Sequence, residues 1–307
     1  MKINKVLLWQ TAWHFIIFFS LTFTVTEPDS ARADERTNYL NNFGVGARAM
    51  GLNNAYTASC NDYTAPFWNP AAMDFFTTIK IGAMRSSMSL DRETNYAGFV
   101  LPTEKYGAFA CAWAGFGIKD IEARTSNTQD PDGYFNSNDN IFFLSYAYRL
   151  LASFSIGGNI KLFDYGMQES HANGLGFDLA AFFIPLEKLR FGFIVQDFNS
   201  LLKWRSGIDE KFVQTYRLGA SYELFSNFSL SCDVSKMGSQ KANVAFATEF
   251  LTMKIFQIRC GFNEQRFAGG IGFTLPIRGL YLNFNYAVAT DRFDAGLSDI
   301  LDFSVVF

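Results

Sequence analysis

Few side chains of this sequence are suited to catalysis. The chain contains 2 histidines, and only His171 lies beyond the first 33 residues. A histidine that acts as a general base needs a nucleophile and an orienting carboxylate beside it, and no such triad can be assembled around His171 from the sequence. We interpret His171 as a surface residue of an external loop and predict that the protein is not an enzyme and needs no cofactor.

Two further groups of residues could bind a metal ion or form a redox pair. Asp130 and Asp132 lie in an oxygen-rich stretch that lacks the spacing of an EF-hand, so turn chemistry is favoured over calcium binding. The spacing of the 4 cysteines matches neither a C-x-x-C pair nor a zinc site. We predict neither a metal site nor a disulfide framework. The cysteines at issue are Cys60, Cys111, Cys232 and Cys260.

Composition limits the class of protein. Hydrophobic residues form 49% of the 307 residues and charged residues only 18%, against about 25% charged in an ordinary soluble domain. Beyond residue 24, no uncharged stretch approaches the roughly 18 residues of a membrane-spanning helix. A net charge of −3 offers no basic field to phosphates, so no nucleic-acid partner is expected. A sheet with one face covered by lipid fits these facts.

The first 33 residues predict a signal peptide. Lys2 and Lys5 precede an apolar run from Val6 to Phe23, and Ala31-Arg32-Ala33 forms an A-x-A cleavage site. The apolar run is long for a signal peptide, so an uncleaved anchor is the alternative. Both interpretations place the protein outside the cytoplasm.

From residue 78 to the end, apolar and polar residues alternate with period 2, which predicts strands with two unlike faces. Runs of about ten residues suit tilted strands that cross a bilayer. We predict an all-β protein, a transmembrane antiparallel β-barrel of about 14 strands that occupies residues 78–307. The expected strands are 78–88, 92–101, 106–118, 140–150, 154–164, 174–184, 189–197, 213–224, 228–236, 242–250, 255–263, 267–275, 280–289 and 298–307.

The connections between these strands alternate in length. Every second connection is a short turn, whereas the others include long polar loops, notably 119–139 and 197–212. Outer-membrane barrels place short turns in the periplasm and longer loops outside. The pattern therefore predicts the outer membrane of a diderm, Gram-negative-type bacterium, with both termini periplasmic and outer-membrane lipid around the barrel.

Charged residues recur on one face of the alternating strands. Because an Arg or Lys at the bilayer midplane costs roughly 2–4 kcal/mol on the lipid side, we expect this face to line the lumen. A soluble sandwich with the same face in water is the alternative. The predicted lumen residues are Lys161, Arg190, Arg217, Glu223, Asp233, Glu249 and Arg259.

Residues 34–77 do not alternate and predict a compact element. Small residues permit close backbone packing, and Asn69 before Pro70 suits a helix start. A barrel of fourteen strands has a lumen wider than its side chains can fill, so this segment is expected to plug it.

The stretch G-x-G-A-R-A-x-G-x-x-x-A-Y (44–56), followed by an aspartate and by W-N-P-A-A (68–72), resembles the N-terminal block of the PorV/PorQ family. That family belongs to the FadL-like superfamily of outer-membrane proteins. The resemblance implies a hatch inside a fourteen-stranded barrel, shaped by an Asn-Pro-Ala motif that matches Asn69, Pro70 and Ala71. We assign Arg48 and Asp62 of the same block to the hatch as gate residues.

The resemblance also implies passive uptake of small hydrophobic molecules, such as long-chain fatty acids, with release into lipid at a kinked third strand. In this chain that strand is 106–118, and its glycines suit a kink, although they could equally face a bulky neighbour. The predicted lateral opening is therefore at Gly107, Gly115 and Gly117.

Substrate identity does not follow from the fold. The loop 165–173 is shorter than the capture loop of the fatty-acid transporters. Two rival functions stay open: a barrel that serves as partner or shuttle in protein secretion or surface attachment, and a polar porin.

Overall fold

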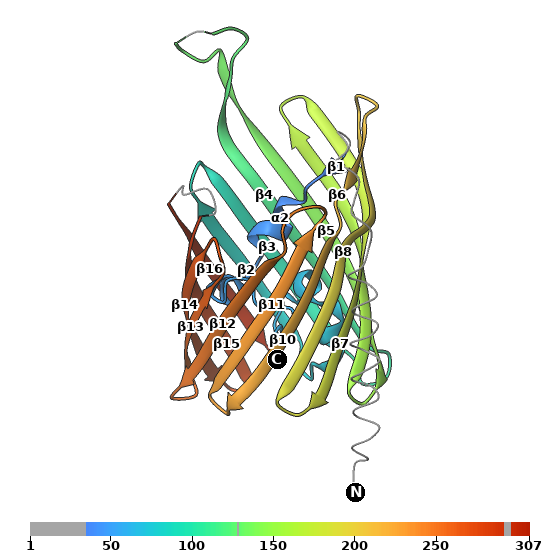
Figure 1. The fold of residues 1–307 in the computed structure, drawn as a ribbon, viewed down its shortest axis with the longest axis vertical. Helices are drawn as coiled ribbons and strands as arrows, with labels where there is room; N and C mark the ends of the chain where they lie inside the picture. Colours follow the sequence, from blue (N-terminus) through green and yellow to red (C-terminus); the bar gives the residue numbers. More distant parts are fainter. Residues whose placement is uncertain (1–34, 128, 292–295) are drawn as a thin grey trace, which may run out of the picture. The chain divides into compact units, whose positions relative to one another are not determined.

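The computed structural model describes residues 35–127, 129–291 and 296–307, and the predicted signal peptide lies outside them. Within the described residues, fourteen antiparallel strands close into a barrel through the β16–β2 and β7–β8 pairs (Figure 1). The strands are β2 (Lys80–Met88), β3 (Arg92–Pro102), β4 (Ala108–Ala123), β5 (Gly133–Leu151), β6 (Phe154–Met167), β7 (Ser170–Leu186), β8 (Leu189–Trp204), β10 (Thr215–Phe225), β11 (Phe228–Met237), β12 (Asn243–Thr252), β13 (Phe256–Phe262), β14 (Phe267–Ile277), β15 (Leu280–Thr290) and β16 (Leu297–Val306).

Every expected strand has a counterpart, but the expected loops are too long. β4 and β5 extend into 119–139, β6 and β7 take up most of 165–173, and β8 extends to Trp204 in 197–212. The last four residues of the latter region form β9 (Asp209–Phe212), which pairs with β8. The extended ends carry polar or exposed residues on both faces, so they lack the alternation on which the sequence prediction depends.

Apolar side chains cover the outer surface of the barrel. In β16, Leu301 is 61% exposed and Phe303 is also exposed, whereas Asp302 between them is 7% exposed. The exposed apolar side chains belong to nearly every strand, which suits a surface in contact with lipid. Among the described residues, no helix combines the length and the apolar content needed to cross a membrane.

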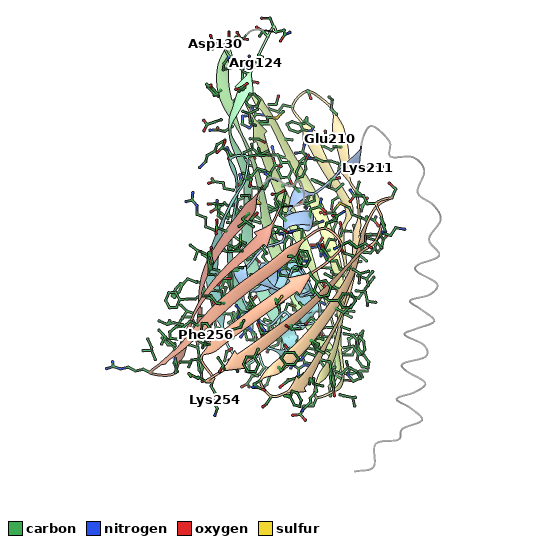
Figure 2. All side chains as sticks on the ribbon, turned by 60° about the vertical axis from the view of Figure 1, so that its left-hand side comes forward. Arg124, Asp130, Glu210, Lys211, Lys254 and Phe256 are labelled. Carbon is green, nitrogen blue, oxygen red and sulfur yellow. The ribbon has the colours of Figure 1, made fainter. Side chains whose placement is uncertain are left out.

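The two ends of the barrel differ. At one end, the turn end, connections are tight: Arg278 and Gly279 join β14 to β15 with positive φ angles of 49° and 89°, as a two-residue type I′ turn requires. At the other end, the loop end, the β4–β5 hairpin projects furthest. Figure 2 shows Arg124 and Asp130 at the loop end and Lys254 at the turn end.

Residues 38–75, here called the N-terminal segment, form short helices: α2 (Tyr39–Phe43), α3 (Ala47–Gly51), α4 (Ala65–Trp68) and the 3₁₀ helix η1 (Pro70–Phe75). α3 contacts β13–β16, and η1 contacts β3–β7. The segment therefore contacts strands on opposite sides of the barrel. Before it, β1 (Glu35–Arg36) pairs in parallel with β9.

Arg36 and Phe307 lie at opposite ends of the barrel. β9 follows β8 at the loop end, whereas Phe307 donates its backbone N–H to Ile79 O at the turn end. The periplasmic location of both termini stays a prediction.

Glycines on the inner face of the strands admit the backbone of the N-terminal segment. A Cβ on Gly192 would stand 2.3 Å from Thr57 O, and one on Gly261 would stand 2.5 Å from Leu52 C. Any larger side chain at these positions would displace the segment. Similar close contacts with backbone atoms of residues 58–71 occur at Gly98, Gly157 and Gly219.

Candidate functional site

A buried lysine joins three neighbouring strands. The Nζ atom of Lys161, on β6, lies 2.6 Å from Asp178 Oδ1 on β7 and also binds Asp197 Oδ1 on β8. Lys161 is 1% exposed, and both aspartates are as deeply buried. Two carboxylates and one ammonium in the interior are tolerable only because further donors surround them.

Those donors come mainly from α2. Asn41 donates from Nδ2 to Asp197 Oδ2 at 2.6 Å, and Asn38 donates to the same oxygen at 3.2 Å. Asn38 is also the N-cap of α2, where its side chain accepts from the Leu40 N–H. The Lys161 cluster, defined as these two asparagines with Lys161, Asp178 and Asp197, thus ties the N-terminal segment to the wall.

A bulge in β8 brings Asp197 into this cluster. The β7–β8 register shifts on both sides of the Phe177–Phe198 pair, so β8 has extra residues there. Asp197 takes a positive φ of 61°, and its N–H donates to Asp178 Oδ1 at 2.8 Å. The bulge therefore turns an aspartate inward next to the lysine.

A second charged group lies where α3 meets the barrel wall. Arg48 binds Glu249 through two nitrogens, both at 2.8 Å, and Arg259 binds the same carboxylate at 2.6 Å. Arg48 also donates to Tyr56 Oη at 3.1 Å. We call these four residues the Arg48 cluster. The predicted gate residue Asp62 adjoins it by accepting from Tyr56 Oη at 2.6 Å.

Burial acts strongly on the titratable groups of the N-terminal segment. It would lower the pKa of the Arg48 guanidinium, but the Glu249 charge holds that pKa well above its usual value. Burial raises the pKa of the Cys60 thiol well above its usual value. Arg48 is therefore a permanent cation, and Cys60 is a neutral thiol.

The Asn-Pro-Ala motif fixes the start of η1. Asn69 accepts the Ala71 N–H at 3.1 Å and donates from Nδ2 to Ala181 O of β7 at the same distance. Pro70 is the first residue of η1, where its missing N–H costs nothing. Ser155 of β6 donates to Ala71 O at 2.7 Å, so strands on this side hold both ends of the motif.

The remaining predicted lumen residues take different positions. Arg217 is buried, with its guanidinium 5.1 Å from the centre of the Trp68 ring, and it donates to Gln196. Asp233 is buried and accepts the Thr57 N–H at 2.9 Å. Arg190 and Glu223 are about one-third exposed and stand 3.8 Å apart.

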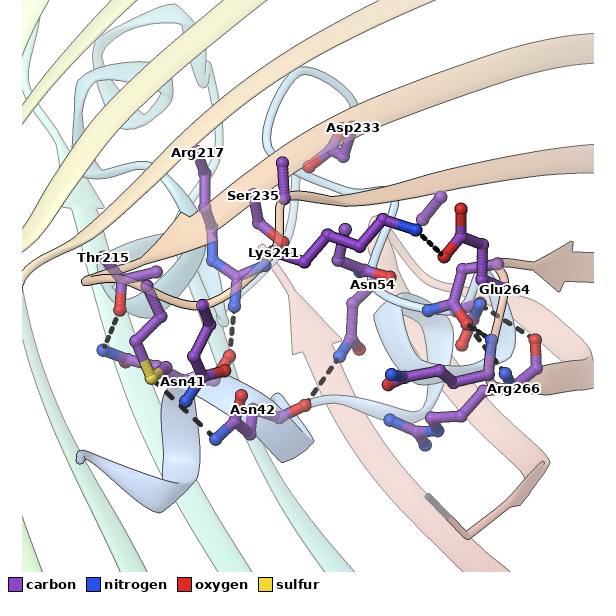
Figure 3. Close-up of a pocket in the computed structure, with 18 residues that line it drawn as sticks. Asn41, Asn42, Asn54, Thr215, Arg217, Asp233, Ser235, Lys241, Glu264 and Arg266 are labelled. Atoms are coloured by element: carbon purple, nitrogen blue, oxygen red, sulfur yellow. Dashed lines mark hydrogen bonds and ion pairs between the residues drawn. The ribbon is translucent and has the colours of Figure 1, made fainter. Parts of the chain in front are cut away.

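Two polar cavities lie between the N-terminal segment and β10–β16. The loop-end cavity has a volume of about 210 Å³, and the side chains around it include Asn41, Asn54, Arg217 and Asp233 (Figure 3). The turn-end cavity, of about 310 Å³, is lined by Asp62 and Lys80 together with the Arg48 cluster residues other than Tyr56.

The glycines predicted for the lateral opening lie in or next to β4. Gly107 precedes β4 with a positive φ of 78°, and a Cβ there would meet Ala147 O. Gly115 and Gly117 are paired with β3 and β5 without interruption, and the register shift lies beyond them, between Ile118 and Ile121. β4 therefore carries an irregularity, next to these glycines and nearer the loop end.

An apolar hollow of about 930 Å³ opens on the outer face of β3–β7. Phe109 and Cys111 of β4 line it, together with Tyr146, Ile160 and Leu179 of the next three strands. Gly158 lies between Tyr146 and Leu179 in the register, so no side chain fills the middle of that row.

The residues considered for chemistry are dispersed. His171 is not in a loop; it is an exposed residue of β7 opposite Gly166. Asp132 accepts hydrogen bonds from Thr125, which lower its pKa. All four cysteines are free. Within the described ranges, no group of three or more His, Cys, Asp or Glu side chains could hold a metal ion.

Sequence reasoning missed Asp178 and Asp197. Asp178 lies at an inward position of a strand and could have been included with the other inward charges. Asp197 could not, because the bulge that turns it inward breaks the period on which face assignment rests.

No family model matches this chain, and no curated protein matches it. Solved structures do. The toluene transporter TbuX of Ralstonia pickettii is similar with a TM-score of 0.62 at 12% identity, over 87% of this chain and 98% of TbuX. The toluene transporter TodX of Pseudomonas putida has a TM-score of 0.62 at 8% identity, over 86% and 97%. A FadL homologue of Pseudomonas aeruginosa has a TM-score of 0.60 at 10% identity, over 85% and 97%.

At these identities the similarity shows a shared fold, which is that of FadL-like channels. This is the fold that the predicted FadL-like superfamily implies. Membership of the PorV/PorQ family stays a prediction.

Proposed function

We propose that this protein is an outer-membrane channel for passive uptake of small hydrophobic molecules, with the N-terminal segment as its plug and gate. The observation that carries the proposal is the combination of an apolar outer surface with a FadL-like barrel. The structures that share the fold include transporters of toluene. The secretion-partner alternative gains no support from these similarities.

The two charged clusters support a gating role for residues 34–77. Each cluster joins the segment to a different part of the wall: the Lys161 cluster to β6–β8, and the Arg48 cluster to β12 and β13. Passage through the lumen requires that some of these contacts break. Apolar solutes are disfavoured beside buried charges, so we place their path along the aromatic side of the segment, where Phe67 faces Phe143 of β5.

We further propose that solutes leave sideways near Gly115 and Gly117. The register shift between Ile118 and Ile121 supports this position. The apolar hollow lies on the outer face of the same strand, nearer the turn end, at Phe109 and Cys111. A solute that left the lumen beside β4 would meet an apolar surface that continues into lipid.

Uptake of labelled oleate and labelled toluene tests the channel. Cells without their own transporter would express the wild type, a Gly115→Trp/Gly117→Trp variant, or the control Gly133→Trp. Gly133 has no atom within 4 Å of its Cβ position. Surface exposure and heat-modifiable mobility would confirm insertion of each protein. We expect uptake by the wild type and the control only. A correctly inserted wild type that takes up neither probe contradicts the proposal.

A disulfide tests the gate. The Cβ position of Gly51 on α3 lies 3.4 Å from Ala287 Cβ on β15, close to the separation found in disulfides. We expect the Gly51→Cys/Ala287→Cys variant to lose uptake when oxidised and to regain it when reduced. Unchanged uptake by the oxidised protein would show that α3 need not leave β15.

A further inference from the structure

The interior of the barrel is polar on the side of β10–β16. Inward positions there carry polar or small residues, such as Ser231, Asp233, Ala247 and Ser304, whereas β4–β8 bring Phe116, Phe143 and Phe182 to the buried interior. Both interior cavities lie on the polar side. A hydrocarbon would gain little there, because amide and charged groups would lose water without new partners.

The loop-end cavity has the chemistry of a binding site for hydroxylated molecules. Its lining includes six asparagines and two glutamines, whose amides offer both donors and acceptors. Three buried oxygens among the lining residues, Asn53 Oδ1, Asn54 Oδ1 and Asp233 Oδ1, make no hydrogen bond within the described structure. Each of these acceptors needs a donor, and a solute hydroxyl would supply one.

The charge of the lining selects among such solutes. The lining of the loop-end cavity has three basic and two acidic side chains, so its net charge is +1 (3 − 2). The basic residues are Arg217, Lys241 and Arg266, and the acidic residues are Asp233 and Glu264. The turn-end cavity has the same net charge of +1 (3 − 2), from three basic and two acidic side chains. These are Arg48, Lys80 and Arg259, and Asp62 and Glu249. Two cavities of the same sign at opposite ends of the polar side favour a solute with one negative charge.

The two cavities are separated by close packing of α3 against the wall. A Cβ on Gly51 would lie 3.3 Å from the Cα atom of Gly270. The backbone of Leu52 fills the space that a side chain on Gly261 would need. The packed contact between α3 and the wall therefore separates a solute in the loop-end cavity from the turn-end cavity.

We propose that the loop-end cavity binds a small hydroxylated monocarboxylate, a polar solute distinct from the hydrophobic molecules of the proposed uptake function. The carboxylate is attracted by the excess cation of the lining, and its hydroxyls donate to Asn53 and Asp233. The volume of about 210 Å³ corresponds to roughly seven water molecules, which suits a sugar acid rather than an oligomer.

Isothermal titration of the purified full chain in detergent tests this inference, with gluconate, glucose and glucosamine as probes of similar size and different charge. Lys241→Glu changes the lining from +1 to −1; Lys241 is 80% exposed, so its replacement should not disturb folding. Lys254→Glu, at the exposed turn between β12 and β13, makes the same change of total charge at the other end of the barrel.

We expect gluconate to bind best, Lys241→Glu to weaken its binding about tenfold, and Lys254→Glu to leave it unchanged. Heat-modifiable mobility would confirm that each protein is folded. Absence of gluconate binding to the folded wild type, equal binding of gluconate and glucosamine, or equal effects of the two substitutions would each overturn the proposal. None of these results depends on uptake of hydrophobic probes.

Discussion

Removal of the buried Lys161 ammonium should strongly destabilise the protein. In a Lys161→Met variant, Asp178 and Asp197 would be left buried beside one another without a cation. Removing one partner of a buried ion pair costs about 3–5 kcal/mol. Asn38, Asn41 and Asn159 still donate to the two carboxylates, so we expect the lower end, about 3 kcal/mol.

The free energy of unfolding can be measured by urea titration in detergent, followed by tryptophan fluorescence. A loss of about 3 kcal/mol corresponds to a change of roughly a hundredfold in the unfolding equilibrium. Lys254→Met is the matched control, since Lys254 is exposed at a turn and its loss should stay within about 0.5 kcal/mol.

A triple variant separates charge from packing. Lys161→Met combined with Asp178→Asn and Asp197→Asn removes all three charges and keeps the approximate volume, so it should recover most of the lost stability. The reasoning is refuted if Lys161→Met is as stable as the wild type, or if the triple variant is no more stable than Lys161→Met.

Three further predictions concern the wall and the segment. Gly192→Val should release the backbone at Thr57 and make the N-terminal segment cleavable by added protease, whereas Gly133→Val should not; equal cleavage would contradict the close approach at Gly192. Leu301→Arg should lower stability in lipid vesicles by about 2–4 kcal/mol if Leu301 faces the bilayer near its midplane, and an unchanged unfolding curve would argue against that position. Arg48→Met should raise single-channel conductance in planar bilayers, because Glu249 loses its bidentate partner in the segment; conductance equal to that of the wild type would show that the Arg48 cluster does not hold the lumen closed.

The barrel could be predicted from the sequence because its signal is local. In a strand with an apolar outer face and a polar inner face, apolar and polar residues must alternate. Two neighbouring residues such as Leu301 and Asp302 therefore indicate which side of the strand faces outward. Fourteen such runs, separated by turn residues, were enough to predict the number of barrel strands and most of their bounds, but not the loop ends of β4–β8. The loop-end extensions of the strands were missed because neither face there is apolar.

The interior could not be predicted in the same way, because its contacts join residues far apart in the chain. Periodicity predicts that Lys161 points inward, but it does not predict the aspartate that a bulge in β8 brings beside it. Nor does the glycine at 192 indicate which backbone approaches it. Composition and period thus determine the wall of this protein. Only the closed tertiary structure decides which inward charges pair, where the N-terminal segment makes contact, and which spaces stay open, since each depends on all strands at once.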